Sequence, residues 1–336
     1  MERWAKSAAD ADHIFIADTG STDKTISIAK RHKVNVASIS IKPWRFDDAR
    51  NAALSLLPAD LDVVIALDLD EVLVPGWRKK LEDNWVDGCN RFRYKYVWNW
   101  HYGNPGLVYY GEKIAGRFTH RWKHPVHEIL KPTVPEIIHF YHDVLIEHHA
   151  DDSKSRGQYL PLLELAVEED PADDRNAHYL AREYFSFRQY NDAIKEFVRH
   201  LDLPRAKWLA ERCASMRYLG KCYEALNDHP EADYWFTMAT FEDSTSREAL
   251  IDAAKFNLAR NNFHRTIDYC ERAMLLPVDG GFYLNERYAL NEGPYDLAGV
   301  AHFHLGNRLK GLELAKKAFE LNPHDSRLGD NVKMMS

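Results

Sequence analysis

The amino-acid sequence predicts an α/β domain with a mainly parallel sheet over residues 1–157 and an all-α domain of helical repeats over 158–336. In the first half, short apolar runs alternate with segments of helical periodicity, and acidic or turn residues follow two of these runs. After about residue 157, strand signals vanish and a recurrent pattern of small and aromatic residues begins. A length of 336 residues is typical of two domains.

Composition narrows the class of protein. Hydrophobic residues make up 45% and charged residues 28%, as in folded globular proteins. No apolar run approaches the roughly 18 residues that span a bilayer, and the first residues lack the apolar stretch of a signal peptide, so we expect no membrane association. The four cysteines are far apart, which excludes a disulfide framework and predicts a cytoplasmic location; they are Cys89, Cys213, Cys222 and Cys270.

The net charge of −7 is unevenly distributed along the chain. Residues 91–132 contain eight basic and two acidic side chains, a local charge of +6, and the flanking segments are acidic. This pattern predicts a local anionic partner and argues against a general nucleic-acid coat.

Three strands and two helices are expected in the first 67 residues. Residues 13–17, 34–41 and 63–67 are short apolar runs that predict strands, and residues 24–31 and 46–57 have the apolar spacing of helices. Alternation of short buried strands with helices predicts a parallel sheet, whose ligands bind outside the carboxyl ends of the strands.

Two clusters of polar residues follow the first and third expected strands. They are Asp18-Thr19-Gly20-Ser21-Thr22-Asp23 and Asp68-Leu69-Asp70-Glu71. Two carboxylates spaced as in Asp68-x-Asp70 can hold a hard divalent cation, although a solvated turn is the more frequent origin of such a pair. The first cluster opens a helix, where free N–H groups and short hydroxyls suit a nucleotide. We expect the two clusters to converge.

Residues 91–102 alternate strictly and predict a long strand or hairpin arm with one aromatic face. That face comprises Phe92, Tyr94, Tyr96, Trp98, Trp100 and Tyr102. Packing against a helix as core is the favoured interpretation. The alternative is a stacking platform for an acceptor, which would use Trp98, Trp100 and, further along, Trp122.

The second half contains four related segments, the clearest being Leu180-Ala181-x-x-Tyr184 and Leu219-Gly220-x-x-Tyr223. Their origins are 39, 34 and 45 residues apart, which brackets the tetratricopeptide period of about 34. Small residues allow two helices to approach closely, and such pairs stack into a solenoid whose concave face often holds a peptide or protein. The array could equally buttress the first domain.

The ordered set of motifs resembles the family 2 glycosyltransferases of GT-A fold. The resemblance is carried by the Asp18–Thr25 segment, by Phe46-x-x-Ala49-Arg50-Asn51 and by the Asp68–Glu71 segment. It is extended by His124-Pro125-Val126-His127-Glu128, Ile146-x-His148, Lys154 and Arg156. These additional motifs are similar to those of the subgroup in which tetratricopeptide repeats follow the transferase domain, as in bacteriocin S-glycosyltransferases.

The resemblance implies a donor site for a nucleotide sugar, with a UDP-sugar favoured. Asp18 would face the base, while Ser21, Asp23 and Arg50 would help to shape the nucleotide site. Asp68 would contact the ribose or the metal side. The expected metal ligands are Asp70, which would coordinate Mn²⁺ or Mg²⁺ on the diphosphate, and His148.

The residue that deprotonates the acceptor is less sharply indicated. Family 2 enzymes invert configuration and commonly use an Asp or Glu as the base. Glu128 is the preferred candidate, with His127 and Asp143 as alternatives, and an acceptor thiol would need less help. No His-Glu-x-x-His motif predicts a zinc site, and most of the neighbouring histidines are expected to be structural.

One departure from GT-A folds concerns the start of the domain. Only about twelve residues precede the first expected strand, so a central strand found in these folds is expected to be missing. Its loss would expose a hydrogen-bonding edge, through which a homodimer could form.

The leading hypothesis is an inverting, metal-dependent glycosyltransferase acting on a peptide or protein. A modified nucleic-acid base, as in phage DNA-modifying transferases, is the competing acceptor because ten aromatic residues lie in the basic segment between Phe92 and Trp122. A non-catalytic repeat scaffold with a degenerate transferase domain is the alternative function. A metal-dependent hydrolase or nucleotidyltransferase could also use the acidic pair.

Overall fold

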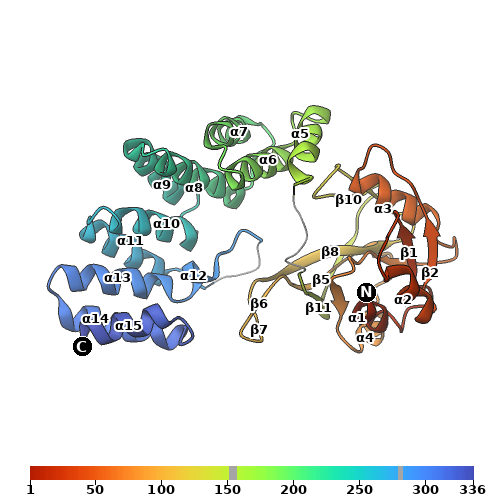
Figure 1. Ribbon diagram of the computed structural model, residues 1–336, viewed down its shortest axis with the longest axis horizontal. Helices are drawn as coiled ribbons and strands as arrows, with labels where there is room; N and C mark the ends of the chain where they lie inside the picture. Colours follow the sequence, from red (N-terminus) through yellow and green to blue (C-terminus); the bar gives the residue numbers. More distant parts are fainter. Residues whose placement is uncertain (151–156, 279–282) are drawn as a thin grey trace. The chain divides into compact units, whose positions relative to one another are not determined.

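The computed structural model describes residues 1–150, 157–278 and 283–336, which form two compact units (Figure 1). The first unit spans Met1–Ala166 and the second begins at Val167, apart from a short segment near Tyr283 that is grouped with the first. The division falls within helix α5 (Tyr159–Glu169), whereas the sequence predicted a boundary just before this helix. No helix in the described ranges combines the length and apolar character needed to cross a membrane.

A five-stranded sheet forms the centre of the first unit. Its strand order is β3 (Val63–Ile65), β8 (Val108–Gly116), β5 (Arg91–Val97), β11 (Ile138–His148) and β4 (Glu71–Leu73). Only β5 and β11 pair in parallel; the other neighbours are antiparallel. The prediction of a mainly parallel sheet is therefore wrong for this five-stranded sheet. The chain passes from β5 to β8 through a short hairpin connection, which permits only antiparallel pairing of these two strands.

A separate two-stranded parallel sheet comes from the first residues. It pairs β1 (Phe15–Asp18) with β2 (Asn35–Ser38), and α2 (Thr25–Arg31) makes the crossover. Trp4 of α1 (Glu2–Ser7) packs with Ala29 and Val34 to form its small core. Within the described residues, β1 pairs only with β2 and β3 only with β8.

The aromatic face of β5 changes its environment along its length. Phe92, Tyr94 and Tyr96 are buried in a core with Trp77 and other residues of α4 (Trp77–Asp83), so the core interpretation is confirmed for them. The strand ends at Val97, and the chain continues into a small hairpin of β6 (Trp100–His101) and β7 (Asn104–Pro105). Trp98 and Tyr102, which continue the alternation beyond the strand, are exposed.

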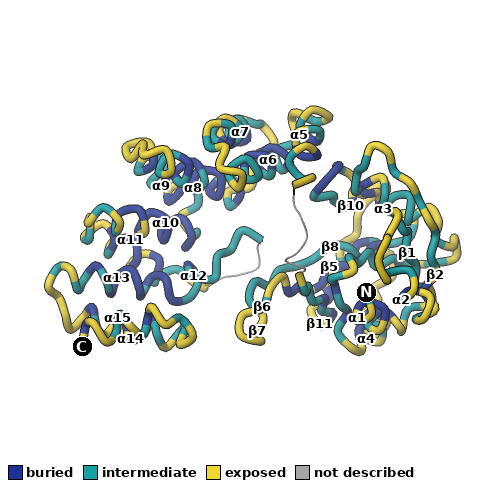
Figure 2. Tube along the Cα trace, in the orientation of Figure 1, coloured by how far each residue is buried: buried dark blue, intermediate teal, exposed yellow. Residues whose placement is uncertain are grey.

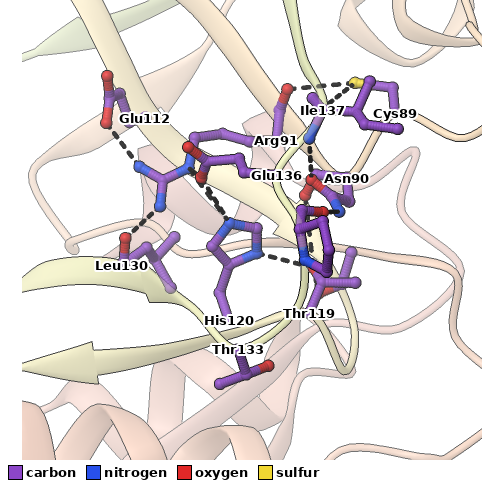
Figure 3. A network of polar contacts seen from close by, with 12 residues as sticks. Cys89, Asn90, Arg91, Glu112, Thr119, His120, Leu130, Thr133, Glu136 and Ile137 are labelled. Atoms are coloured by element: carbon purple, nitrogen blue, oxygen red, sulfur yellow. Dashed lines mark hydrogen bonds and ion pairs between the residues drawn. The ribbon is translucent and has the colours of Figure 1, made fainter.

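Arg91 fastens a second hairpin, formed by β9 (His120–Lys123) and β10 (Ile129–Pro132), to the sheet (Figure 3). This buried guanidinium bonds to Glu112 and Glu136, at 2.6 Å each, and donates to the carbonyl oxygen of Leu130. His120 is also buried and lies 3.0 Å from the Glu136 carboxylate. The hairpin that carries Trp122 is therefore held to the sheet by Arg91, a residue of the basic segment. The remaining helix of this unit that concerns the site is α3 (Phe46–Ser55).

The second unit is a stack of antiparallel helix pairs, which confirms the predicted helical repeats. The pairs are α6 (Asp174–Ser186) with α7 (Tyr190–Asp202), α8 (Leu209–Ala225) with α9 (His229–Glu242), α10 (Arg247–Leu258) with α11 (Phe263–Leu275), and α13 (Gly293–His304) with α14 (Arg308–Leu321), before α15 (Ser326–Met335). A Cβ atom on Gly220 would lie 2.7 Å from the ring of Phe236, so this glycine permits the close packing of α8 on α9.

An inserted segment explains the longest repeat spacing. Between α11 and α13 the chain forms the short helix α12 (Arg287–Leu290), and Glu286, just before it, contacts α8 and α10. Helix α10 is buried along most of its length (Figure 2). The amide N–H of Glu286 donates to Glu248, and its carboxylate pairs with Arg217. Arg217 also bonds to Asp252 at 2.8 Å. The spacing of 45 residues thus includes a segment that covers part of the array's own surface.

Candidate active site

The loop between β3 and β4 carries the central carboxylates of the site. β3 and β4 are the two edge strands of the five-stranded sheet, so the residues that connect them, including Asp68 and Asp70, cross the ends of the three strands between. Those inner strands contribute Lys113 from β8, Tyr96 from β5 and His148 from β11. The fold therefore brings polar side chains from three strands to the loop that joins the two edge strands.

Asp68 is held by two cations. Arg50 of α3 donates to its Oδ1 atom and Lys113 donates to its Oδ2 atom, each at 2.6 Å. Burial by itself would raise the pKa of Asp68, but Lys113 and Arg50 overcome this effect and hold the pKa well below its usual value. The Asp68 carboxylate is consequently ionised at neutral pH and fixed in orientation.

Arg50 joins Asp68 to Glu128. Its Nε atom donates to the Glu128 carboxylate, and its guanidinium lies over the Trp122 ring, 4.7 Å from the centroid. Asn51 holds Trp122 in place through hydrogen bonds to the backbone N–H and C=O of that residue. Trp122 is only 4% exposed, so its predicted contact with an acceptor needs correction: the ring supports Arg50 from within the core.

Asp70 and His148 are also brought together. The Nε2 atom of His148 lies 3.9 Å from Oδ2 of Asp70, and the Nδ1 atom lies 2.9 Å from the carbonyl oxygen of Trp98. Because a carbonyl only accepts, Nδ1 is the donor in this contact, and Nε2 is the ring nitrogen that faces Asp70. The described residues contain no group of three or more His, Cys, Asp or Glu side chains that could hold a metal ion. Any cation here would need further ligands from a bound molecule or water.

Two exposed or half-buried tryptophans surround His148. Trp98 is 42% exposed and its ring stacks on the imidazole with centroids 4.7 Å apart. The indole N–H of Trp100 donates to the backbone oxygen of His148 at 3.2 Å, and its ring stacks on His149. Trp98 and Trp100, which the sequence predicted to bind the acceptor substrate, thus lie next to His148, a candidate cation ligand.

The residues predicted to contact the nucleotide lie after β1, in the other sheet. Asp18 accepts from the backbone N–H groups of Gly20 and Ser21, at 3.2 and 3.1 Å, and Asp23 accepts from Thr25 at 2.9 Å. The Ser21 hydroxyl and these backbone groups lower the pKa of Asp18. Asp18, Ser21 and Asp23 therefore form an exposed turn rich in hydrogen-bonding groups.

The alternative bases are separated by the fold. His127 adopts a positive φ of 49° and its ring lies against Tyr159, with centroids 5.6 Å apart. Asp143 lies in the irregular part of β11, in a hollow lined also by Asn84 and residues 138–144, and not beside Asp68. Lys154 and Arg156, which extended the family resemblance, fall outside the described residues.

Sequence reasoning gave no role to Lys113, Glu71 or Tyr96. Glu71 belongs to the Asp68–Glu71 motif, and Lys113 is one of the basic residues of the segment 91–132, but neither pattern indicates a partner. The contact of Lys113 with Asp68 and that of Tyr96 with Glu71 depend on strand order, which the sequence did not predict.

A known family model matches most of the first unit. Residues 2–134 match the family model described as glycosyl transferase family 2. Among curated proteins, no relative matches the chain. Similar solved structures include MamA, with 15% identity over 51% of this chain and 87% of that chain at a TM-score of 0.39. They also include YrrB, titled a TPR protein with an unusual peptide-binding site (18% identity, 53% and 83%, TM-score 0.40), and yeast Tom70 (16% identity, 55% and 36%, TM-score 0.42).

Proposed function

We propose that this protein is an inverting glycosyltransferase that moves a sugar from a nucleotide-sugar donor to an acceptor with the help of a divalent cation. The proposal depends above all on one observation. Arg50 contacts Asp68 and also pairs with Glu128, and His148 lies beside Asp70 in the same loop. This loop lies within the segment that matches the glycosyltransferase family model.

The charges of the site suit a divalent cation. Asp68, Asp70, Glu71 and Glu128 bring four negative charges, and Arg50 and Lys113 bring two positive charges, which leaves −2. Asp70 and His148 are the side chains that would hold Mn²⁺ or Mg²⁺, since Asp68 is already paired with two cations. When bound, such a cation offsets the charge that develops on a leaving diphosphate.

The other residues would bind the donor and accept a proton. Asp18, Ser21 and Asp23 would contact the nucleoside, with uridine favoured, and Arg50 orients both Asp68 and Glu128. In the reaction an acceptor oxygen or sulfur forms a bond to the anomeric carbon as the bond from that carbon to the diphosphate breaks. The acceptor proton passes to Glu128, the nucleoside diphosphate leaves with the bonding electrons, and His127 is the second candidate for the base.

A peptide or protein is the favoured acceptor, with Trp98 and Trp100 as its stacking surface. Several cations of the basic segment are engaged internally and cannot serve as a footprint for phosphates. Arg91 and Arg93 pair with Glu112, and Lys113 pairs with Asp68 and Glu71. Binding of a nucleic-acid strand, with a steep fall as salt increases, would support the competing acceptor. The buried free cysteines support a reducing, cytoplasmic location.

A thermal-shift screen tests the proposal. UDP, GDP, TDP and their sugars are added to the full chain with and without Mn²⁺, using Asp70→Ala as the test variant and the exposed Asp60→Ala as its control. A ligand at about 100 times its Kd stabilises a protein by roughly 2.7 kcal/mol, which raises Tm by a few degrees. We expect a Mn²⁺-dependent shift with one nucleotide that only Asp70→Ala abolishes.

The released product separates the proposed function from its competitors. A glycosyltransferase releases a nucleoside diphosphate, whereas a nucleotidyltransferase releases pyrophosphate and a hydrolase releases phosphate or a nucleotide without consuming an acceptor. The absence of any donor-dependent shift would favour the non-catalytic scaffold, for which the divided sheet is the supporting observation.

A further inference from the structure

Glu71 is a carboxylate with no role in the reaction described above, yet it is the most deeply buried charge near the site. It is 1% exposed at the start of β4. Its Oε1 atom accepts from the Tyr96 hydroxyl at 2.7 Å and from Lys113 Nζ at 2.6 Å, and its Oε2 atom accepts from the Asp68 N–H at 2.8 Å. A buried carboxylate is costly unless it is fully hydrogen-bonded, and here three separate elements supply the donors.

Lys113 connects this carboxylate to Asp68. Its ammonium lies 2.6 Å from Oε1 of Glu71 and 2.6 Å from Oδ2 of Asp68. Burial alone would lower the pKa of Lys113, but Glu71 and Asp68 raise it above its usual value, so the ammonium stays charged. Lys113 thus links Asp68, in the loop that crosses from β3 to β4, to Glu71 on the edge strand β4.

The crossing loop comprises residues 66–70, and its backbone is bonded to β8 and to the residue that follows β11. Its backbone hydrogen bonds join Ala66 to Lys113, Glu71 to Asp68 and His149 to Asp70, and the Leu69 side chain is exposed. Glu71 also pairs opposite His148 in the β4–β11 register, and the Tyr96 ring stacks on His148. The position of Asp68 relative to His148 is consequently set through Glu71 and its two donors.

We infer that Lys113 and Glu71 are positioning residues that fix the Asp68 carboxylate for donor binding and leave cation binding to Asp70 and His148. This inference rests on the proposed function. Both oxygens of Asp68 already accept from a cationic side chain, Arg50 on one and Lys113 on the other, which makes Asp68 a poor ligand for a further cation. Its remaining hydrogen-bonding capacity suits a donor hydroxyl.

The test compares Lys113→Met with Lys113→Arg, which keeps the charge, and with Lys123→Met, an exposed lysine on β9. Tyr96→Phe is a milder variant that removes a single donor to Glu71 if Lys113→Met does not fold. On the full chain we would measure the Kd for UDP in the presence of Mn²⁺ and the Kd for Mn²⁺ alone. We would also measure kcat and KM for the release of UDP from a UDP-sugar donor. Substitution of residues that orient ligands typically costs about 10- to 100-fold in affinity or activity.

We expect Lys113→Met to raise the Kd for UDP and the KM for the donor by at least about 10-fold, with a change in Kd for Mn²⁺ alone below about threefold. Lys113→Arg should recover most of the loss, and Lys123→Met should behave as the unchanged protein. An unaltered Kd for UDP in a folded Lys113→Met protein would overturn the inference and leave the proposed function standing. So would an equal loss of Mn²⁺ affinity, because Asp68 would then share in binding the cation.

Amide hydrogen exchange over residues 66–71 gives a readout that needs no donor. If the unchanged protein neither binds nor consumes any nucleotide sugar, the proposed function fails, and the role in donor binding fails with it. The exchange measurement then decides the structural part separately. Faster exchange by at least about tenfold in Lys113→Met supports the fixing of the loop, and unchanged exchange overturns it.

Discussion

The Nε2 atom of His148 lies 3.9 Å from Oδ2 of Asp70, although the two residues come from different strands and loops. The Nδ1 contact with the Trp98 carbonyl orients the imidazole, and the register of β4 against β11 brings it to the crossing loop. A pair oriented in this way can contribute two ligands to one cation.

Substitution of His148 therefore tests the cation site. We expect His148→Ala to weaken Mn²⁺ binding in the presence of UDP by about 10- to 100-fold, measured by titration calorimetry. His142→Ala is the matched control because it lies on the same strand but faces the Tyr110 hydroxyl, 2.8 Å away. Equal effects of the two substitutions would contradict the assignment of His148.

Glu128 is expected to affect turnover more than donor binding. Glu128→Gln keeps the size of the side chain and removes the group that would accept the acceptor proton. With a hydroxyl acceptor we expect kcat to fall by about 10²- to 10⁴-fold, and with a thiol acceptor by less. The control is Glu82→Gln, which alters only an exposed pair with Arg78. Unchanged turnover in Glu128→Gln, together with a collapse in His127→Gln, would transfer the role to His127.

The repeat unit contains a histidine that should make stability depend on pH. His178 is fully buried beside Ser215 and His200, and burial lowers its pKa to about 3. In the unfolded chain the pKa is about 6.5, so between these values only the unfolded state takes up the proton. Stability from this group is present above about pH 6.5 and is lost as the pH falls toward 3, by up to about 1.4 kcal/mol per pH unit.

Urea denaturation between pH 4 and 6.5 measures this effect. Carboxylates also contribute to acid destabilisation, so the informative quantity is the difference in slope between variants. We expect His178→Gln to have a flatter dependence of unfolding free energy on pH than the unchanged protein, and the exposed His264→Gln to have the same dependence. Parallel slopes in all three proteins would be inconsistent with a neutral, buried His178.

Gly220 should not tolerate a methyl group. Alanine normally favours a helix over glycine by about 1 kcal/mol, but here the added Cβ would lie 2.7 Å from Phe236. Overpacking of this kind costs about 1–3 kcal/mol, so Gly220→Ala should lower the unfolding free energy measured in urea. Combination with Phe236→Leu should recover part of the loss, and strict additivity of the two substitutions would argue against the contact.

The four cysteines should be unreactive in the native protein. All are buried free thiols, and burial raises the pKa of Cys213 and of Cys222 to about 12. Because the thiolate is the reactive form, we expect negligible reaction with Ellman's reagent in buffer and reaction of all four thiols in guanidinium chloride. Rapid native labelling of any of them would contradict the packing described.

Local features of the fold were predictable from the sequence. The strands β2 and β3 and the helices α2 and α3 fall within the expected segments, and β1 extends one residue beyond its segment, to Asp18. The agreement follows because side-chain periodicity and helix-ending residues act over a few neighbours. The same holds for the helical repeats. The 45-residue spacing is longer than the tetratricopeptide period of about 34, but the sequence did not indicate what the additional residues do. The contact of Glu286 with Arg217 joins residues 69 apart, and no local pattern encodes it.

The alternating aromatic segment from Phe92 to Tyr102 shows a limit of prediction from local sequence pattern. The alternation from Phe92 to Tyr102 is uniform in sequence, yet α4 covers only its first half, so burial differs between residues with the same periodicity. In the sequence, Trp122 is likewise one more aromatic residue in a basic segment. Only the tertiary structure shows that its ring is buried beneath Arg50.

The sequence by itself determined which residues could carry the chemistry: a carboxylate pair after a buried strand, a second polar turn, and a histidine near the end of the domain. The tertiary structure decided how they combine. Asp68 meets Arg50 and Lys113, 18 and 45 residues away, because strand order brings distant segments to one end of the sheet. Hydrophobic burial and strand pairing set that order, and both depend on contacts between residues far apart in the chain.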